Sequence, residues 1–175
     1  MDLNKHIAVI NGYPKPGISF KDVTPLIANP EAFNYAVDEF IKFAKEKGAN
    51  IIVGPEARGF IFGAPVAVKG GYGFIPVRKP GKLPREVISY SYDLEYGSDT
   101  LCMHKDAIKK GDKVVIIDDL VAVGGTIDAA AHLIESLGGE VVGVACVIAL
   151  EGLPGIKNIP EKYPFRALLT LSDKE

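Results

Sequence analysis

Four apolar runs constrain the fold of this chain most strongly, because they alternate with segments of helical length. IIVG (51–54), YGFIPV (72–77), DKVVIID (112–118) and EVVGVACVIAL (140–150) are almost continuously hydrophobic, and FRALLTL (165–171) is a further strand-like run. Strands that are apolar on both faces are typical of parallel sheets covered by helices on each side. The sequence therefore predicts an α/β fold with a central, mostly parallel sheet flanked by helices.

Helix signals lie between these runs. Asn29 can cap a helix, Pro30 suits its first position, and Gly48 suits the residue just past its end. A second helix is expected from about Arg58, and a third over GTIDAAAHLIESLGG (125–139). Residues 79–100 interrupt the alternation with prolines, charges and aromatic residues, which indicates a hairpin or flap.

The 175 residues fit one domain over 1–175, with no repeat or linker. Apolar residues make up 47% and charged residues 24%, and the net charge of −2 predicts no general attraction to nucleic acid or to anionic membranes. No apolar stretch approaches 18 residues, and the first residues, MDLNKHIAVING, do not resemble a signal peptide. Cys102 and Cys146 are isolated, so we expect buried free thiols in a reducing cytoplasm.

The third run continues into VVIIDDLVAVGGT (114–126), which places two carboxylates before a glycine pair. Gly124 and Gly125 allow a tight turn whose N–H groups, with a helix behind them, suit a phosphate. Asp118 and Asp119 suit hydroxyl groups, so the motif predicts a ribose 5-phosphate site. Neither GxGxxG nor GxxxxGK[ST] occurs. From spacing alone, solvated aspartates beside a tight turn remain an alternative.

The same motif resembles the phosphoribosyl-pyrophosphate motif of type I phosphoribosyltransferases. Four further blocks resemble the adenine phosphoribosyltransferases in order and spacing, and the resemblance runs from about residue 6 to about 171. The blocks are GYPKPGISFKDVTPLI (12–27), GPEARGFIFGAPVA (54–67), VRKPGKLP (77–84) and SYSYDLEYGSDTL (89–101).

The resemblance implies the type I phosphoribosyltransferase fold, with a base-binding region at about 6–28 and a flexible flap at about 79–100. The implied reaction converts adenine and phosphoribosyl pyrophosphate to AMP and pyrophosphate. Mg²⁺ would be held mainly by substrate and water, with no direct protein ligand, and the protein would be a homodimer.

Each part of the substrate has implied partners in this sequence. The resemblance implies that Asp118 and Asp119 bind the ribose. The pyrophosphate would be bound by the loop residues Glu56, Ala57 and Arg58, together with Arg78 and Lys82 of the flap. An unusual peptide bond is expected between residues 56 and 58. The 5′-phosphate would be bound by the loop Ala122, Val123, Gly124, Gly125 and Thr126. Thr126 offers both a backbone amide and a side-chain hydroxyl as donors.

The base pocket is expected at Ser19, Phe20 and Lys21. Phe20 would stack on the purine, and the backbone groups of Ser19 and Lys21 would bind the Watson–Crick edge of adenine. A 6-oxopurine presents the opposite donor and acceptor pattern, which would leave buried groups unpaired at about 1–3 kcal/mol each.

Glu95 matches the acid proposed in this family to act at N7 of adenine. A carboxyl group donating there would draw electrons from the ring and release N9 for attack, and in the reverse direction would aid departure of the base. This role requires a proton on the carboxyl group and an apolar setting, which Tyr90, Tyr92 and Tyr96 could supply. His6, His104 and His132 lie in no motif, and we expect them at the surface or in helix packing.

Val123 departs from the family pattern, which has threonine or serine at this position. The missing hydroxyl removes one hydrogen bond to a charged oxygen, worth about 1.5–3 kcal/mol. Two other functions remain as alternatives: transfer to another base such as xanthine, and sensing of phosphoribosyl pyrophosphate without catalysis. A sensor of that kind would carry a DNA-binding segment before residue 6, and none is evident.

Overall fold

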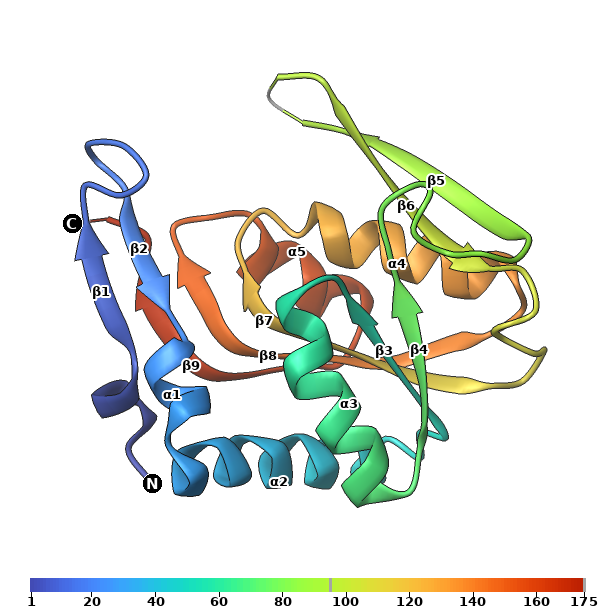
Figure 1. Ribbon diagram of the computed structural model, residues 1–175, viewed down its shortest axis with the longest axis horizontal. Coiled ribbons are helices and arrows are strands. Elements are labelled where there is room, and N and C mark those ends of the chain that lie inside the picture. The colour runs from blue at the N-terminus through green and yellow to red at the C-terminus, as the bar shows by residue number, and fades with distance from the viewer. Residues whose placement is uncertain (95, 175) are drawn as a thin grey trace.

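Five parallel strands form the central sheet, in the order β4-β3-β7-β8-β9 (Figure 1). The computed structural model describes residues 1–94 and 96–174. The α/β fold with a parallel sheet is therefore confirmed. The strands are β3 (Ile51–Pro55), β4 (Gly73–Val77), β7 (Lys113–Val121), β8 (Glu140–Glu151) and β9 (Phe165–Ser172).

Both faces of the sheet are covered, which explains why its strands are continuously apolar. Along β7, Val115 and Ile117 belong to one buried cluster, whereas Val114 and Ile116 belong to a second. Burying each such side chain contributes about 1.5–3 kcal/mol. The first cluster includes side chains of α2 (Pro30–Glu46) and α3 (Arg58–Gly70), and the second those of α4 (Gly125–Ser136) and α5 (Gly155–Lys162).

The strand order reverses direction between β3 and β7. The chain passes from β3 through α3 to β4 on one side, and later returns to place β7 on the other side of β3. In open parallel sheets, ligands bind at the carboxyl ends of the strands where this reversal occurs. The loops that follow β3 and β7 therefore share one crevice.

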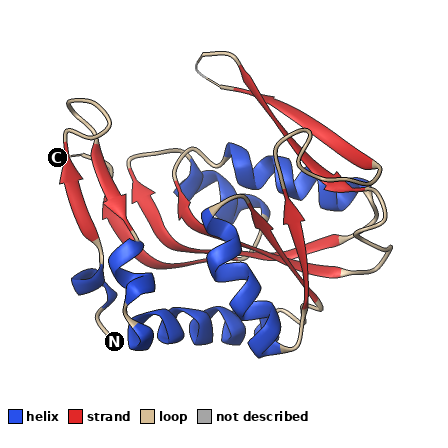
Figure 2. Cartoon of the chain, in the orientation of Figure 1, coloured by secondary structure: helices blue, strands red, loops and turns tan. Residues whose placement is uncertain are grey.

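Two antiparallel hairpins flank the edge formed by the carboxyl ends of the strands (Figures 1 and 2). The first pairs β1 (Ala8–Asn11) with β2 (Ser19–Asp22), preceded by η1 (Leu3–His6) and followed by α1 (Thr24–Ala28). The second pairs β5 (Val87–Asp93) with β6 (Ser98–His104).

The flap at about 79–100 stays a prediction, and the strand β6 that begins within it continues to His104 because its buried residues, including Met103, pack into the second core cluster. One predicted strand boundary was wrong. The strand 112–118 continues to Val121, because Leu120 and Val121 remain paired with Ile148 and Ala149 of β8.

Other local predictions are confirmed. The Asn29 side chain accepts a hydrogen bond from the Ala32 N–H at 3.0 Å, Pro30 opens α2, and Gly48 follows its end with a positive φ. Cys102 and Cys146 are buried free thiols. Among the described helices, none is both long and apolar enough to cross a membrane.

Candidate functional site

Asp118 and Asp119 lie side by side at the reversal point, near the carboxyl end of β7. The Asp118 Oδ1 accepts a hydrogen bond from the Asp119 N–H at 2.8 Å, and the Asp119 side chain is almost fully buried. Burial, followed by the negative charge of Asp119, raises the pKa of Asp118 well above its usual range. The pair thus concentrates negative charge that a ligand or a cation must compensate.

Arg58, the first residue of α3, supplies part of this compensation. Its Nε donates a hydrogen bond to Asp119 Oδ2, and this bond and the charge of Asp119 raise the pKa of Arg58. A cation is unfavourable at a helix N-terminus, so Asp119 explains why an arginine is tolerated there. The Arg58 side chain remains 56% exposed, which leaves the rest of its guanidinium free to meet an anion.

The loop between β3 and α3 is shaped by close contacts. The Glu56–Ala57 peptide is cis, within the range where an unusual bond is expected. Glu56 Oε1 accepts the Lys79 N–H at 2.6 Å and lies 3.3 Å from Arg78 Nε, within ion-pair distance. Arg78 also lies over the Phe60 ring. The structure therefore joins the loop after β3 to the segment after β4.

The loop after β7 turns directly into α4. Gly124 precedes the helix at a φ of 96°, and its neighbour Gly125 begins it. The loop is anchored from outside by Gly155, whose N–H donates to the Ala122 carbonyl at 2.9 Å. The loop leads into the N-terminus of a twelve-residue helix, and a helix N-terminus of this kind suits a phosphate.

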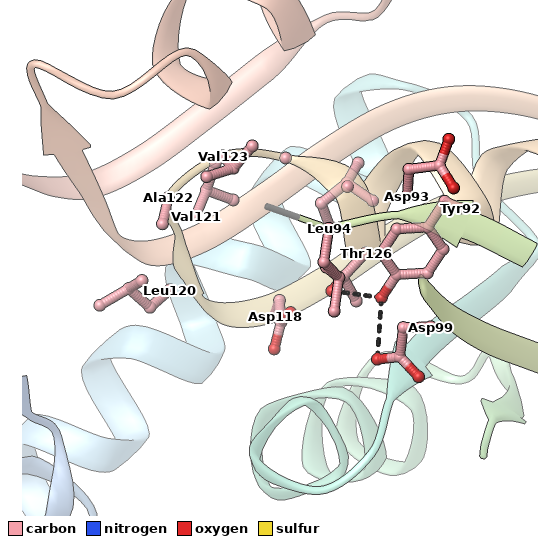
Figure 3. Close-up of a pocket in the computed structure, with 13 residues that line it drawn as sticks. Tyr92, Asp93, Leu94, Asp99, Asp118, Leu120, Val121, Ala122, Val123 and Thr126 are labelled. Atoms are coloured by element: carbon pink, nitrogen blue, oxygen red, sulfur yellow. Dashed lines mark hydrogen bonds between the residues drawn. The ribbon is translucent and has the colours of Figure 1, made fainter. Parts of the chain in front are cut away.

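A cavity of about 470 Å³ opens between this loop and the β5–β6 hairpin (Figure 3). All five residues of the predicted 5′-phosphate loop line it, together with Asp118. On the hairpin side, the Tyr92 hydroxyl donates to Asp99 Oδ2 at 3.3 Å and lies 3.5 Å from Thr126 Oγ1. The remaining lining residues are Asp93, Leu94, Leu120, Val121 and Ile127.

The β1–β2 hairpin presents an unpaired strand edge. Gly12 N donates to Ile18 O at 2.8 Å, so by the antiparallel alternation the Ser19 and Lys21 backbone groups point away from β1. No described strand pairs with that edge of β2. Phe20 is half-buried, and Tyr13 meets it edge-on at a centroid distance of 5.3 Å. Main-chain donors and acceptors beside an aromatic ring can bind a planar heterocycle.

Side chains of the base region form a separate network. The Lys21 Nζ donates to Ser19 Oγ at 2.5 Å, and this hydroxyl donates to Asn11 Oδ1 at 3.0 Å. Lys21 is only 8% exposed. These bonds tie the two strands together and hold the adjacent backbone.

Several predicted site residues do not line the cavity. Ser19, Phe20, Lys21, Glu56, Ala57, Arg58, Arg78 and Lys82 all lie outside it, and Lys82 is exposed. Glu95 lies outside the described residues. Of the tyrosines expected around it, Tyr92 lines the cavity, Tyr90 stacks on His132 with a centroid distance of 4.0 Å, and Tyr96 is 88% exposed. Because Glu95 lies outside the described residues, the setting expected for it stays a prediction.

Sequence reasoning missed Lys79, Asp99 and Gly155. Lys79 Nζ donates to Asp99, which in turn accepts from Tyr92. Their contacts depend on the meeting of segments distant in the chain, and the sequence pattern carries no signal for them. Within residues 1–94 and 96–174, no three or more His, Cys, Asp or Glu side chains group as a metal site.

Comparison with known proteins shows which family this chain resembles. Residues 27–166 match the model of the phosphoribosyl transferase domain. The chain is 47% identical to an adenine phosphoribosyltransferase of Thermoanaerobacter pseudethanolicus, with a TM-score of 0.91 over 97% of this chain and 98% of that one. For a Rhodothermus marinus adenine phosphoribosyltransferase the identity is 46% and the TM-score 0.89, over 97% of this chain and 96% of that one.

A third similar structure carries ligands. It is an adenine phosphoribosyltransferase of Saccharomyces cerevisiae, 37% identical, with a TM-score of 0.90 over 96% of this chain and 97% of that one. That protein was solved with adenine and D-2,5-dideoxy-2,5-imino-altritol 1,6-bisphosphate. The similarity thus extends over nearly the full length of both chains.

Proposed function

The chain belongs to the adenine phosphoribosyltransferase family, and from this premise we propose which of its groups bind and transfer the phosphoribosyl unit. The reaction moves the 5-phosphoribosyl group from phosphoribosyl pyrophosphate to adenine, giving AMP and pyrophosphate for purine salvage. One observation carries the proposal: Asp118, whose carboxylate is bonded to the N–H of Asp119, lines one cavity with all five residues of the glycine loop, next to the reversal point of the sheet.

The ribose and its phosphate would occupy the two parts of the loop motif. Asp118 and Asp119 accept hydrogen bonds from the ribose hydroxyls, and the amides from Ala122 to Thr126 donate to the 5′-phosphate. The N-terminus of α4 adds the favourable end of a helix dipole. The volume of about 470 Å³ supports a ligand of this size.

The pyrophosphate would lie at the loop after β3. The exposed part of the Arg58 guanidinium would bind the leaving group, and Glu56 and Ala57 lie beside Arg58 in the same loop. Arg78 and Lys82 add positive charge from the segment after β4. Because Arg58 is bonded to Asp119, binding of the pyrophosphate and of the ribose would be linked through this arginine.

Adenine would bind between the Phe20 ring and the open edge of β2. The outward N–H and C=O groups of Ser19 and Lys21 support recognition of a 6-aminopurine by the main chain. The loop after β3 is close enough for the charge of Arg58 to act on the end of β2. After the larger effect of hydrogen bonds from Thr24, that charge further lowers the pKa of Asp22.

Glu95 is our candidate for the proton at N7, on the basis of the DLEYG block. Its carboxyl group would donate to N7 when the base leaves, so by microscopic reversibility it would accept that proton in the forward direction, the opposite of the forward role expected from the sequence. Leu94, its neighbour in the sequence, lines the cavity and supports an apolar setting.

Mg²⁺ fits this site as a metal brought by the substrate. Mg²⁺ keeps several waters and is coordinated largely by substrate phosphates, so it would be held by substrate and water, and the Asp118 and Asp119 carboxylates would accept hydrogen bonds from those waters. When bound, the ion would neutralise charge on the pyrophosphate group.

We also propose that the functional unit is a homodimer in the cytoplasm, with 1–175 acting as one domain. An apolar groove of about 440 Å³ between α2 and α3 supports association, and Val68 on its rim is 85% exposed. The buried free thiols of Cys102 and Cys146 are compatible with a reducing compartment.

Formation of AMP tests the function. Purified protein with phosphoribosyl pyrophosphate, Mg²⁺ and adenine should give AMP and pyrophosphate, whereas hypoxanthine, guanine and xanthine should react at least about a hundredfold more slowly, because each would leave buried groups unpaired. Turnover of xanthine but not adenine would contradict the choice of base. Tight binding of phosphoribosyl pyrophosphate with no turnover of any base would favour the sensing alternative.

A further inference from the structure

We propose that Tyr92 is a positioning residue for the 5′-phosphate: its hydroxyl group holds the Thr126 side chain, and with it the phosphate loop, in the orientation that binds the anion. The inference rests on the proposed function of the loop and deepens it. It assigns a role to Tyr92 of the β5–β6 hairpin, which lies 34 residues before Thr126 in sequence.

The contact between Tyr92 and the loop involves both its ring and its hydroxyl (Figure 3). The ring packs so closely against Gly125 that a Cβ atom on that glycine would lie 3.1 Å from the nearest ring carbon. The hydroxyl oxygen lies 3.5 Å from Thr126 Oγ1 and 3.3 Å from Asp99 Oδ2. Tyr92 and Asp99 are directly paired across the two strands, so the hairpin itself fixes this pair.

Charge determines the direction of these hydrogen bonds. A hydrogen bond from Lys79 Nζ is the largest cause of the lowered pKa of Asp99, so this group is a carboxylate at neutral pH and only accepts. Tyr92 therefore donates to Asp99, and its free lone pairs can accept the Thr126 hydroxyl. When an anion takes the Thr126 hydrogen, the Tyr92 hydrogen can turn from Asp99 to Thr126 Oγ1, so the contact that holds Oγ1 persists with its direction reversed.

Lys79 also reduces the negative charge that the phosphate meets in the cavity. Asp99 lines the same cavity, and an uncompensated carboxylate there would repel the anion. The Lys79 ammonium group offsets that charge and also joins the segment after β4 to the hairpin. The four groups thus form one connected chain of contacts from the flap to the phosphate loop.

Among the side chains of the loop, only that of Thr126 can form such a hydrogen bond with Tyr92. Thr126 is the one member of the five-residue loop whose side chain carries a hydrogen-bond donor, because the others are alanine, valine and two glycines. Val123 is 64% exposed and lines the cavity with an apolar side chain where a hydroxyl could have reached the phosphate. If the hydrogen bond between Tyr92 and Thr126 is lost, no other side chain of the loop can therefore replace it.

The test compares Tyr92→Phe with Tyr90→Phe. Tyr92→Phe keeps the ring on Gly125 and removes only the hydroxyl, whereas Tyr90 sits two residues earlier with its ring stacked on His132. Tyr92→Phe should raise KM for phosphoribosyl pyrophosphate about fivefold to tenfold, the size of one lost hydrogen bond. It should weaken ribose 5-phosphate binding in calorimetry by a similar factor. KM for adenine, kcat and every constant of Tyr90→Phe should stay within about twofold of the wild type, since neither contact is touched.

Val123→Thr sharpens the test by adding a second hydroxyl to the loop. In that background the penalty of Tyr92→Phe should shrink to less than about twofold, because contacts that replace one another are not additive. A full, additive penalty would overturn the inference. So would wild-type constants for Tyr92→Phe, or a parallel change in kcat and both KM values, which would indicate a general structural role.

Ribose 5-phosphate binding separates this inference from the proposed function. If the wild type forms no AMP but binds ribose 5-phosphate, and Tyr92→Phe weakens that binding, the enzymatic proposal fails while the role of Tyr92 stands. If AMP forms normally and Tyr92→Phe binds ribose 5-phosphate as the wild type does, the role of Tyr92 is wrong.

Discussion

Asp118 and Asp119 are adjacent carboxylates with unequal partners. Asp119 is paired with Arg58, whereas Asp118 accepts only the Asp119 N–H among its described hydrogen bonds. The electrostatic cost of the pair therefore falls mainly on Asp118, whose pKa is raised. Bound ribose hydroxyls would donate to this carboxylate and offset that cost.

Replacing Asp118 with asparagine should stabilise the free protein at high pH. The pKa of Asp118 is higher in the folded than in the unfolded chain, so its contribution to stability is lost as pH rises through the folded pKa. The variant should thus have a higher Tm than the wild type at pH 8, with the gain shrinking toward about pH 4, near the unfolded pKa of aspartate. Its kcat/KM should fall at least about tenfold through loss of a charge-assisted hydrogen bond.

Asp112→Asn is the matched control with the opposite sign. Hydrogen bonds from the Asn50 side chain and the Lys109 N–H lower the pKa of Asp112. That contribution is present above the unfolded pKa and lost in acid, so this variant should be less stable than the wild type at pH 8, with a gap that closes as pH falls. Equal pH profiles for the two variants in thermal unfolding would contradict the assignment.

Val123→Thr should lower KM for phosphoribosyl pyrophosphate by about tenfold, the lower end of a hydrogen bond to a charged group. The exposed side chain at this position lines the cavity, so a hydroxyl there can meet the phosphate. Steady-state kinetics with adenine in excess measures the change, and Val123→Ala controls for altered bulk. An unchanged or higher KM for the threonine variant would refute the argument from the hydroxyl.

At the scale of elements, the phosphate loop is held between two others. The Tyr92 ring of β5 covers Gly125 from one side, and Gly155 at the start of α5 bonds to Ala122 from the other. A Cβ atom on Gly155 would lie 2.4 Å from the Ala122 carbonyl oxygen, a distance that requires one element to move. The loop conformation is thus a product of its neighbours as well as its own glycines.

Gly155→Ala should therefore displace the phosphate loop. Overpacking of this kind costs about 1–3 kcal/mol, and affinity for ribose 5-phosphate should fall together with Tm. Thermal unfolding and calorimetry measure the two effects. Asn158→Ala, an exposed site in the same helix, should leave both unchanged. Normal phosphate affinity in Gly155→Ala would mean that α5 does not position the loop.

At the scale of the whole molecule, the sheet places the two hairpins on either side of one edge (Figure 1). The two hairpins, one proposed to bind the base and the other beside the proposed phosphate loop, come from segments that are separate in sequence. The apolar groove between α2 and α3 lies apart from this edge, which leaves it available to a second copy of the chain.

Val68→Asp should weaken self-association. A charge on the rim of the groove would be buried without a partner on dimer formation, so sedimentation should shift from twice the mass of one chain toward that of a single chain. Val68→Ile, which keeps an apolar side chain, should sediment as the wild type. A dimer unaffected by Val68→Asp would place the interface elsewhere.

The sequence by itself determined the five strands of the central sheet, the long helices and the residue types of the proposed phosphate loop. These follow from local physics: apolar runs specify buried strands, Asn29 and Pro30 specify a helix start, and glycines permit the turn before α4. The short helix α5 escaped prediction, because Pro154, Gly155 and Pro160 favour a loop and burial of Ile159 stabilises the helix only in the folded chain.

Only the tertiary structure decided which groups meet. Arg58 and Asp119 are 61 residues apart in sequence, and Tyr92 and Thr126 are 34 apart, yet both pairs are in contact. The first contact follows from the placement of β7 beside β3, and the second from the packing of the hairpin on α4. Strand order and packing depend on burial summed over the whole core, which no local pattern of residues records.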